Sequence, residues 1–303
     1  MAYRFHTADV FTDRVFGGNQ LAVLPDARGL TDEQMQRVAA EFNIAETSFV
    51  FPPETADGTR KLRIFTPFRE LPFAGHPTVG TAHVLAAIGE IDLTGDLTEI
   101  TFEEGVGPVP VSIASRDGKP VSATLTAAQM PETREVAIER EEIADMLSLA
   151  PSDIRSDMPI SAVSCGVPFL YVPLTDLDAA ARARVKVDRM EALMGDAWAH
   201  AVYVICLQAV LTQAKLHARM FAPAFGIAED PATGAAATAL AGYLAPLEHP
   251  DKTEFHWIVE QGVEMGRPSI IDVRARQHNG AITEIRVGGQ SVLVSKGEIE
   301  IPD

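Results

Sequence analysis

The sequence predicts an α+β fold of two pseudo-symmetric domains, each a curled, barrel-like mixed β-sheet around a central α-helix. Short segments of the kind that form strands dominate the chain. The segments 78–87 and 235–244 consist of small residues with almost no polar face, as expected of a helix that other structure surrounds. Three landmarks also recur in the same order in both halves of the chain, which indicates an ancient duplication.

Strands are predicted where polar and apolar residues alternate, or where turn residues close a short apolar run. In the first half these segments are 4–10, 21–24, 44–51 and 61–66. Thr31 and Gln34 have the spacing of a capping box and predict the start of an amphipathic helix. His76–Pro77 opens the first of the two apolar helices, which runs to about Ile88.

The repeated landmarks define the two halves. They are 18–23 with 166–172, His76 with Asp230, and 102–106 with 259–263. Pro131 and a cluster of charged residues lie between the halves. We therefore assign a first domain to residues 1–128 and a second to 129–284, and the C-terminal strands at 285–303 could return to the first.

Three further segments complete the prediction. The amphipathic segment 139–149 is expected to match the helix that begins at Thr31, and the apolar segment 197–211 is expected to be a buried strand. The tail, 285–301, is expected to be a pair of strands around 287–289 and 296–297.

Charge and composition exclude several classes of function. The chain has 25 Lys and Arg against 42 Asp and Glu, a net charge of −17, and no basic stripe, so we expect neither a nucleic-acid nor a membrane partner. No apolar signal segment opens the sequence, and no apolar run is long enough to cross a membrane. Cys165 and Cys206 have no metal-type spacing. We expect a cytoplasmic protein without metal or cofactor.

The starts of the two apolar helices predict an anion site without Lys or Arg. A helix N-terminus presents free N–H groups and the positive end of the helix dipole. Gly75 supplies such donors in the first half, and Gly234 and Ala235 supply them in the second. If the two halves face each other, both N-termini could hold a carboxylate or stabilise an enolate-like charge in one cleft. The plainer interpretation of Asp230–Pro231 is a helix cap.

Two titratable residues stand out in apolar surroundings. Glu46 lies in a strand-like stretch, where it is either an outward-facing residue or a partly buried acid. A buried carboxyl group would be a candidate general acid or base. His76 is a poor N-cap residue, so its place at a helix start needs another reason. His83 is interpreted as a core histidine whose hydrogen bonds are satisfied.

Several motifs together resemble the phenazine-biosynthesis isomerase (PhzF-like) family, which shares its fold with diaminopimelate epimerase. They are VFGGN at 15–19, AET at 45–47, FTP at 65–67, ELPFAGHPTVGT at 70–81, RMFAP at 219–223, EDPATG at 229–234, QG at 261–262 and MGRPS at 265–269. The resemblance covers essentially the whole chain, and the blocks around His76 and Asp230 are the most specific.

The resemblance implies a cofactor-independent isomerase, with its active site in the cleft between two domains. The acid/base glutamate of the family falls on Glu46, and its polar residues at the helix starts fall on His76 and Asp230. Asn19 and Thr233 are then expected to bind the substrate, together with Gly75, Gly234 and Ala235. The expected reaction moves a carbon-bound proton within a small unsaturated carboxylate, and the expected assembly is a homodimer.

The sequence also departs from the family. The epimerase branch has a cysteine at each helix start, and the alignment places Ala74 and Pro231 there, which disfavours two-base racemisation. Ala45 and Ala235 replace serines of the phenazine enzyme, so the resemblance predicts the class of reaction rather than the substrate. Two alternatives stay open, a non-catalytic member that binds a metabolite or protein, and a lyase that uses the same site.

Overall fold

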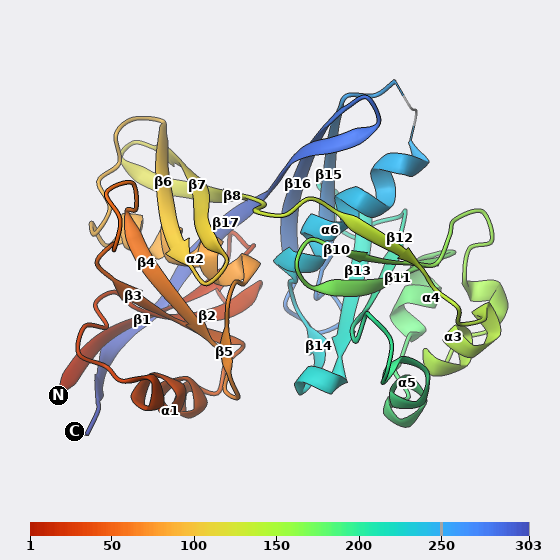
Figure 1. Cartoon of the computed structure of the whole chain (residues 1–303), viewed down its shortest axis with the longest axis horizontal. Coiled ribbons are helices and arrows are strands. Elements are labelled where there is room, and N and C mark those ends of the chain that lie inside the picture. The colour runs from red at the N-terminus through yellow and green to blue at the C-terminus, as the bar shows by residue number, and fades with distance from the viewer. Residues whose placement is uncertain (249–250, 303) are drawn as a thin grey trace. The chain divides into compact units, whose positions relative to one another are not determined.

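The computed structural model describes residues 1–248 and 251–302, which form two compact units. Unit 1 consists of residues 1–128 together with the C-terminal segment from residue 288, and unit 2 consists of residues 129–287. Each unit contains a mixed β-sheet and one helix that is buried almost all round (Figure 1). The predicted α+β class, with a curled sheet around a central helix in each half, is confirmed.

The strands of unit 1 close into a ring. They are β1 (Ala2–Val10), β2 (Asn19–Leu24), β3 (Glu46–Phe51), β4 (Arg60–Phe65), β5 (Glu70–Leu71), β6 (Leu97–Glu104), β7 (Gly107–Arg116), β8 (Lys119–Thr126) and the later part of β17 (Ala281–Glu300). The ring runs β1, β2, β3, β4, β6, β7, β8, β17, and β17 pairs with β1 again. β5 adds a short antiparallel pair at the edge of β4.

Helix α2 (Gly75–Ala87) fills the ring. Its residues from Gly75 to Ala86 are all buried, and it contacts β1, β2, β3, β7 and β8. Gly80 lets the helix approach the sheet closely, because a Cβ atom there would lie 2.5 Å from Cγ2 of Val10 and 2.6 Å from Cδ2 of Leu21. The small residues that gave this helix no polar face are therefore needed for its packing.

Helix α1 (Asp32–Phe42) covers another part of unit 1 and packs against β3 and β4. The predicted capping box is present, because the Thr31 hydroxyl accepts from Gln34 N and the Gln34 side chain accepts from Thr31 N. Met35, Val38 and Ala39 form its buried face.

Unit 2 repeats the strand pairing of unit 1. Its strands are β9 (Glu132–Glu135), β10 (Ser161–Ser164), β11 (Pro168–Leu174), β12 (Val202–Cys206), β13 (Leu216–Ala222), β14 (Ile227–Asp230), β15 (Glu254–Gln261), β16 (Ser269–His278) and the start of β17. β11 and β12 are parallel like β2 and β3, and β12 and β13 are antiparallel like β3 and β4. β13 and β15 are parallel like β4 and β6. The predicted duplication is thus visible in the topology.

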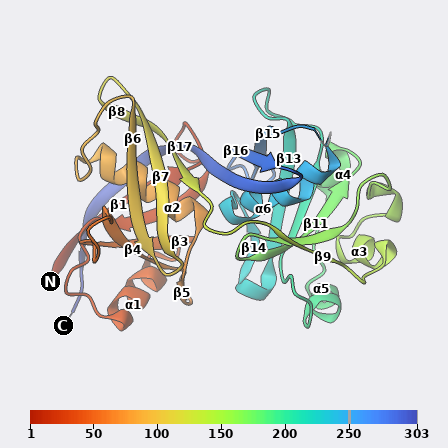
Figure 2. The same cartoon turned by 45° about the horizontal axis from the view of Figure 1, so that its top comes forward.

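The helices of unit 2 lie on both faces of its sheet. The central helix α6 (Gly234–Leu244) contacts β9, β10, β11 and β16. The helices α3 (Arg140–Met146), α4 (Leu177–Arg182) and α5 (Val187–Met194) share a separate apolar core with β11 and β12 on the other face (Figure 2). Short 3-10 turns occur at η1 (Pro151–Asp153), η2 (Pro223–Phe225) and η3 (Ala245–Leu247).

Two expected elements of unit 2 are wrong. α3 precedes β10 and so does not match α1; the helices between β11 and β12, α4 and α5, take the place that α1 has between β2 and β3. The buried strand expected at 197–211 is limited to β12, residues 202–206. Amphipathic periodicity identifies a helix but not its place in the order of strands.

The tail is one continuous strand, β17, rather than a pair of strands. Its glycines lie within this strand and permit close approach of neighbouring groups. A Cβ atom on Gly288 would lie 2.2 Å from Oγ1 of Thr124, and one on Gly297 would lie 2.8 Å from the ring of Phe5. The turn that precedes β17 lies instead at Asn279–Gly280, where both residues have positive φ as in a type I′ hairpin turn.

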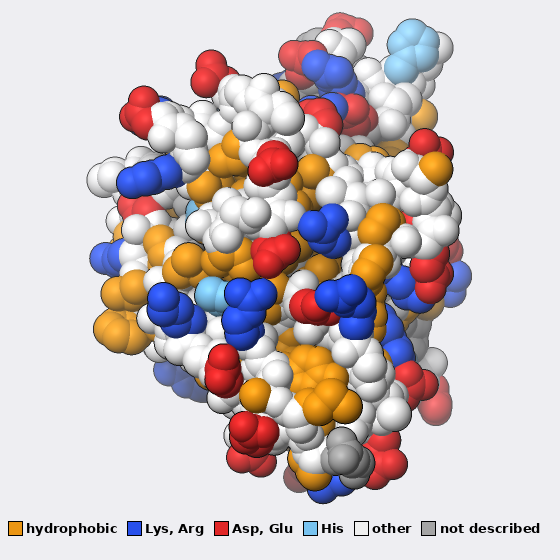
Figure 3. All heavy atoms as spheres, turned by 90° about the vertical axis from the view of Figure 1, so that its left-hand side faces the viewer, with side chains coloured by type: hydrophobic (Ala, Val, Ile, Leu, Met, Phe, Trp, Pro, Cys, Tyr) orange, Lys and Arg blue, Asp and Glu red, His pale blue; other side chains and the backbone are white. Residues whose placement is uncertain are grey.

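Among the described residues, no helix combines the length and hydropathy that a membrane crossing requires. On the face drawn in Figure 3, basic side chains are interspersed with acidic ones and form no continuous basic patch. The expectation that neither nucleic acid nor a membrane is a partner stays a prediction.

Candidate functional site

The sequence Glu-x-Pro-x-x-Gly occurs before each central helix, at 70–75 in unit 1 and at 229–234 in unit 2. Its glycine is the first residue of the helix, and we call the five residues before it, 70–74 and 229–233, the approach segment. Pro72 lies three residues before the first residue of α2, and Pro231 lies three residues before the first residue of α6. The N-cap residues are then Ala74 and Thr233.

This register corrects the internal alignment predicted from the sequence. Asp230 ends β14 and corresponds to Leu71, whereas His76, in the first turn of α2, corresponds to Ala235. The sequence paired His76 with Asp230 because a proline follows each. Pro77, however, lies inside the first helical turn, where a missing N–H is tolerated. The counterpart of Ala74 is likewise Thr233 and not Pro231.

An arginine fork anchors both approach segments. In unit 1, Nε and Nη2 of Arg63 donate to the two carboxylate oxygens of Glu70 over 2.7 and 2.6 Å. In unit 2, Nε and Nη2 of Arg219 donate to Glu229 over 2.8 Å each. Each guanidinium also lies over the phenylalanine two residues further along its strand, at 5.2 Å for Phe65 and 4.9 Å for Phe221. Bidentate pairs of this kind fix geometry strongly.

The structure brings three predicted site residues together in unit 1. Oε2 of Glu46 lies 2.9 Å from Nε2 of His76, and both side chains are almost completely buried, with 12% and 6% exposed. Nδ2 of Asn19 lies 3.3 Å from Nδ1 of His76, and the carbonyl oxygen of Gln20 lies 3.3 Å from Nε2. Within the described residues, Oε2 of Glu46 takes part in no aligned hydrogen bond, so this oxygen remains able to accept a proton.

Elements of the ring explain this placement. Glu46 begins β3 and pairs in register with Leu21 of β2, and Asn19 begins β2. His76 stands in the first turn of the helix that the ring encloses. The start of the buried strand β3 fixes the position of Glu46, and the start of α2 fixes that of His76, so both were visible in the sequence.

Unit 2 contains a different polar cluster at the start of α6. Oγ1 of Thr233 donates to Oδ2 of Asp230 over 2.5 Å. Nε2 of Gln261 donates to the Asp230 carbonyl over 2.7 Å and to Oγ1 of Thr233 over 2.9 Å, and its Oε1 accepts from Thr233 N. Burial, together with the negative charge of Asp230, raises the pKa of Tyr203, whose hydroxyl donates to the same Oε1. The cluster fixes the conformation of the Asp230 carboxylate.

Gln261 was not predicted as a site residue, although Gln261–Gly262 was noted as a repeated landmark. The sequence feature that could have identified Gln261 is the glycine that follows it. A Cβ atom on Gly262 would lie 2.6 Å from the carbonyl oxygen of Pro231, so the end of β15 packs directly against the approach segment.

Both helix starts keep donors for an anion. Neither Ala74 nor Thr233 caps its helix with a side-chain hydrogen bond. The first N–H groups of a helix have no intrahelical acceptor, and Gly75, Gly234 and Ala235 lie in these positions. The geometry within each unit is therefore compatible with the predicted anion-binding role of these residues.

Equivalent positions of the two duplicated units do not hold the same titratable residues. Phe65 pairs with Thr47, and its counterpart Phe221 pairs with Val202, so Glu46 corresponds to Ala201. His76 corresponds to Ala235 in the same way. At these equivalent positions of the described chain, unit 1 has a carboxylate and an imidazole and unit 2 has two alanines, an arrangement suited to one acid/base group rather than to two opposed bases.

His83 lies further along α2 and is buried, as expected, but its Nδ1 has no hydrogen-bond partner among the described residues. Burial lowers the pKa of His83 to about 4, so this ring is neutral. Within the same part of the chain, no group of three or more His, Cys, Asp or Glu side chains is arranged to hold a metal ion.

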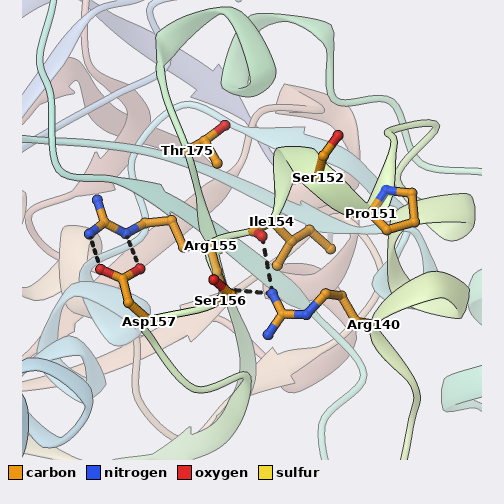
Figure 4. Close-up of a pocket in the computed structure, with 8 residues that line it drawn as sticks. All are labelled: Arg140, Pro151, Ser152, Ile154, Arg155, Ser156, Asp157 and Thr175. Atoms are coloured by element: carbon orange, nitrogen blue, oxygen red, sulfur yellow. Dashed lines mark hydrogen bonds and ion pairs between the residues drawn. The ribbon is translucent and has the colours of Figure 1, made fainter.

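A pocket of about 360 Å³ in unit 2 contains none of the predicted site residues (Figure 4). Nη1 of Arg140 donates to the carbonyl oxygens of Ile154 and Arg155, and the Arg155 guanidinium is paired with Asp157 (Figure 4). Both cations of this pocket are therefore already paired, Arg140 with backbone carbonyl groups and Arg155 with a carboxylate.

Comparison with known proteins identifies relatives along the whole chain. Residues 8–297 match the family described as phenazine biosynthesis-like protein. An uncharacterised isomerase of Mesorhizobium japonicum is 38% identical over 299 residues, which cover 97% of each chain. The trans-2,3-dihydro-3-hydroxyanthranilate isomerase of Pseudomonas fluorescens is 35% identical over 298 residues, which cover 96% of this chain and 97% of that protein.

The solved structure of a PhzF-family phenazine biosynthesis protein from Bacillus anthracis superimposes with a TM-score of 0.91 and 29% identity. It covers 99% of this chain and 100% of that one. The diaminopimelate epimerase-like fold predicted from the sequence is thereby confirmed.

Proposed function

The chain belongs to the phenazine biosynthesis-like family and is an isomerase, and we propose that it moves a proton within a small unsaturated carboxylate by means of Glu46. One observation carries this proposal. The frame is duplicated, yet the strand and helix start that place the Glu46 carboxylate 2.9 Å from the His76 imidazole in unit 1 carry Ala201 and Ala235 at the equivalent positions of unit 2. A buried carboxyl group of this kind is suited to general acid/base catalysis.

In the proposed reaction, the Glu46 carboxylate removes a proton from a carbon atom of the substrate. The electron pair of the broken C–H bond enters the conjugated system and becomes an enolate-like charge on the substrate. The protonated Glu46 then delivers the proton to a different carbon atom, forms a new C–H bond and becomes a carboxylate again. One C–H bond breaks and one forms, so the balance requires no cofactor.

His76 and Asp230 are proposed to orient the reactants. Nε2 of His76 contacts the Glu46 carboxylate, and Asn19 lies beside Nδ1, the other nitrogen of the same imidazole ring. Asp230 is held by Thr233 and would accept a hydrogen bond from a polar group of the substrate. The helix-start donors of Gly75, Gly234 and Ala235 would bind the substrate carboxylate. This role requires that the group around Glu46 and His76 and the group around Asp230 bind the same substrate molecule.

The substrate is proposed at the level of its class. The Pseudomonas fluorescens relative is named for trans-2,3-dihydro-3-hydroxyanthranilate. Ala45 precedes Glu46, and Ala235 lies in the first turn of α6, and neither side chain can hydrogen-bond to a substrate group. A missing hydroxyl in a polar site can change discrimination between substrates by orders of magnitude. We therefore propose the shared proton shift on a differently substituted unsaturated carboxylate.

A deuterium exchange experiment tests the proposal. The protein is incubated in deuterated water with a panel of cyclic and linear unsaturated carboxylates, and carbon-bound deuterium is followed by mass spectrometry and NMR. The wild type should incorporate deuterium into a product of unchanged composition. Glu46→Gln, which keeps the shape of the side chain, should lose about 100-fold or more of this rate. Glu41→Gln, at an exposed position of α1, is the matched control and should behave as the wild type.

The same assay separates the alternatives. A lyase would yield two products or a product with altered composition, and a non-catalytic binding protein would show saturable binding without deuterium incorporation. Glu46→Gln with the wild-type exchange rate would remove Glu46 from the mechanism.

A further inference from the structure

Glu104 occupies in unit 1 the place that Gln261 occupies in unit 2. Each residue ends the strand that pairs in parallel with the arginine-bearing strand, β6 with β4 and β15 with β13. Each is followed by a glycine that packs against the proline of the approach segment. A Cβ atom on Gly105 would lie 2.8 Å from Cα of Pro72, and one on Gly262 would lie 2.9 Å from Cα of Pro231.

Gln261 works in unit 2 as both donor and acceptor. Its amide nitrogen donates to the approach segment, and its amide oxygen accepts from Thr233 N, so both ends of the side chain are needed. A carboxylate could only accept hydrogen bonds, whereas a protonated carboxylic acid keeps one donor and one acceptor, as an amide does.

Glu104 has the surroundings of a neutral acid. The residue is 9% exposed. Oγ1 of Thr78 lies 2.7 Å from Oε1 of Glu104 and 2.8 Å from the carbonyl oxygen of Ala74. A hydroxyl has one proton to donate, so when Thr78 donates to the carbonyl oxygen, a protonated Oε1 can donate to Thr78. Oε2 of Glu104 is buried and has no hydrogen-bond partner among the described residues. A buried carboxylate with one unpartnered oxygen would be costly, and protonation removes that cost.

No opposite charge offsets this burial. Burial raises the pKa of Glu104 to about 8, although the hydrogen bond from Thr78 acts in the opposite direction. The neighbouring elements carry His76 in the first turn of α2 and Lys61 on β4, which pairs with Glu103. Neither of these groups contributes to the shift, within the described part of the chain.

We propose that Glu104 is a positioning residue that acts as a neutral carboxylic acid, and that it holds the first turn of α2, and thereby His76, as Gln261 holds the start of α6. Thr78 connects Glu104 to the start of α2, because its hydroxyl contacts both the Glu104 carboxyl group and the carbonyl oxygen of the N-cap residue Ala74. The role of His76 rests on the proposed function, but the protonation of Glu104 does not.

The test compares Glu104→Gln with Glu104→Ala and with the control Glu103→Gln. Glu103 is the adjacent residue, and its carboxylate accepts from the backbone of Glu54 and Thr55. In infrared difference spectra across the titration near pH 8, the wild type should show a carboxylic-acid carbonyl band that Glu104→Gln lacks and Glu103→Gln keeps. If Glu104→Gln keeps every such band, Glu104 is an ordinary carboxylate and the proposal is overturned.

Stability gives a second readout. The folded wild type retains a proton that the unfolded chain releases near its ordinary pKa of about 4.5. The melting temperature of the wild type should therefore fall relative to Glu104→Gln as the pH rises from about 4.5 to about 8. A difference that stays constant over this range contradicts the proposal.

The positioning of His76 is followed by NMR of labelled histidine. Its ring resonances should shift in Glu104→Ala and return to wild-type positions in Glu104→Gln, because glutamine restores a donor and an acceptor. Equal shifts in both variants would show that the charge of Glu104 is needed. If Glu104→Ala does not fold, the infrared and stability comparisons with Glu104→Gln still decide whether Glu104 is a neutral acid in the folded protein. None of these readouts requires catalytic activity, so a failure of the proposed function would be distinguishable.

Discussion

Arg219 holds Glu229 through two hydrogen bonds of 2.8 Å each, one residue before Asp230. Nη1 of Arg219 also donates to the carbonyl oxygens of Ala180 and Ala183 at the end of α4, and the side chain is only 2% exposed. The equivalent Arg63 in unit 1 is 22% exposed, and its partner Glu70 is 41% exposed. One ancestral fork is thus buried in one unit and more accessible to solvent in the other.

Replacement of Arg219 by lysine should therefore lower the free energy of unfolding more than replacement of Arg63. Arg219→Lys leaves Glu229 and two carbonyl groups without their planar donor, and loss of a buried pair costs about 3–5 kcal/mol. Arg63→Lys removes a more exposed pair, for which about 0–1 kcal/mol is expected. Urea unfolding of both variants measures the difference. Equal losses of unfolding free energy would contradict this account of the two forks.

Variants of His76 and Asp230 should affect binding more than the chemical step. In the proposed site both residues orient the reactants, so His76→Asn and Asp230→Asn should each raise KM about tenfold, which corresponds to about 1.4 kcal/mol. Kinetics of deuterium incorporation with an identified substrate provide kcat and KM separately. A His76→Asn variant with unchanged KM and a kcat reduced as strongly as in Glu46→Gln would instead make His76 the base.

Gly80→Ala should destabilise unit 1 although alanine favours helices. The new Cβ atom would collide with Val10 and Leu21, and overpacking of this kind costs about 1–3 kcal/mol. The gain in helix propensity is about 1 kcal/mol. A double-mutant cycle with Val10→Ala, measured by urea unfolding, should show that Gly80→Ala costs less when the valine methyl groups are absent. Additive losses would mean that the helix moves away from the sheet instead.

The sequence predicted what depends on local pattern and missed what depends on register. The capping box of α1, the buried helices and the neighbourhood of Glu46 and His76 follow from periodicity and motifs. The sequence paired His76 with Asp230 because a proline follows each residue, and only the helix boundaries show that Pro72 is the true counterpart of Pro231.

Contacts between residues far apart in the chain could not be predicted from the sequence either. Glu104 is one of two consecutive glutamates, and nothing local distinguishes it from the half-buried Glu103, because the difference arises from which of them faces Thr78. The glycines of the tail led to the prediction of two strands in place of one, since the sequence does not show that Thr124 and Phe5 lie against them.

The stability of the protein should fall at alkaline pH through His217. Burial alone would lower the pKa of His217, but contacts with Glu260 at 2.7 Å and Glu264 at 3.0 Å outweigh it and raise the pKa to about 9. The folded state therefore binds this proton more tightly than the unfolded chain, whose histidine has a pKa of 6.5. The resulting contribution to the free energy of unfolding is complete below about pH 6.5 and is lost as the pH rises through about 9.

His217→Gln tests this directly, because glutamine can still donate a hydrogen bond to Glu260 but cannot carry the charge. Urea unfolding between these two pH values should show a loss on the order of 3 kcal/mol that belongs to His217 in the wild type and is absent from the variant. Glu260 also accepts from Val210 N and Leu211 N, so hydrogen exchange of these two amides should accelerate above the titration. Parallel pH profiles for wild type and variant would show that the imidazole between the two glutamates is already neutral.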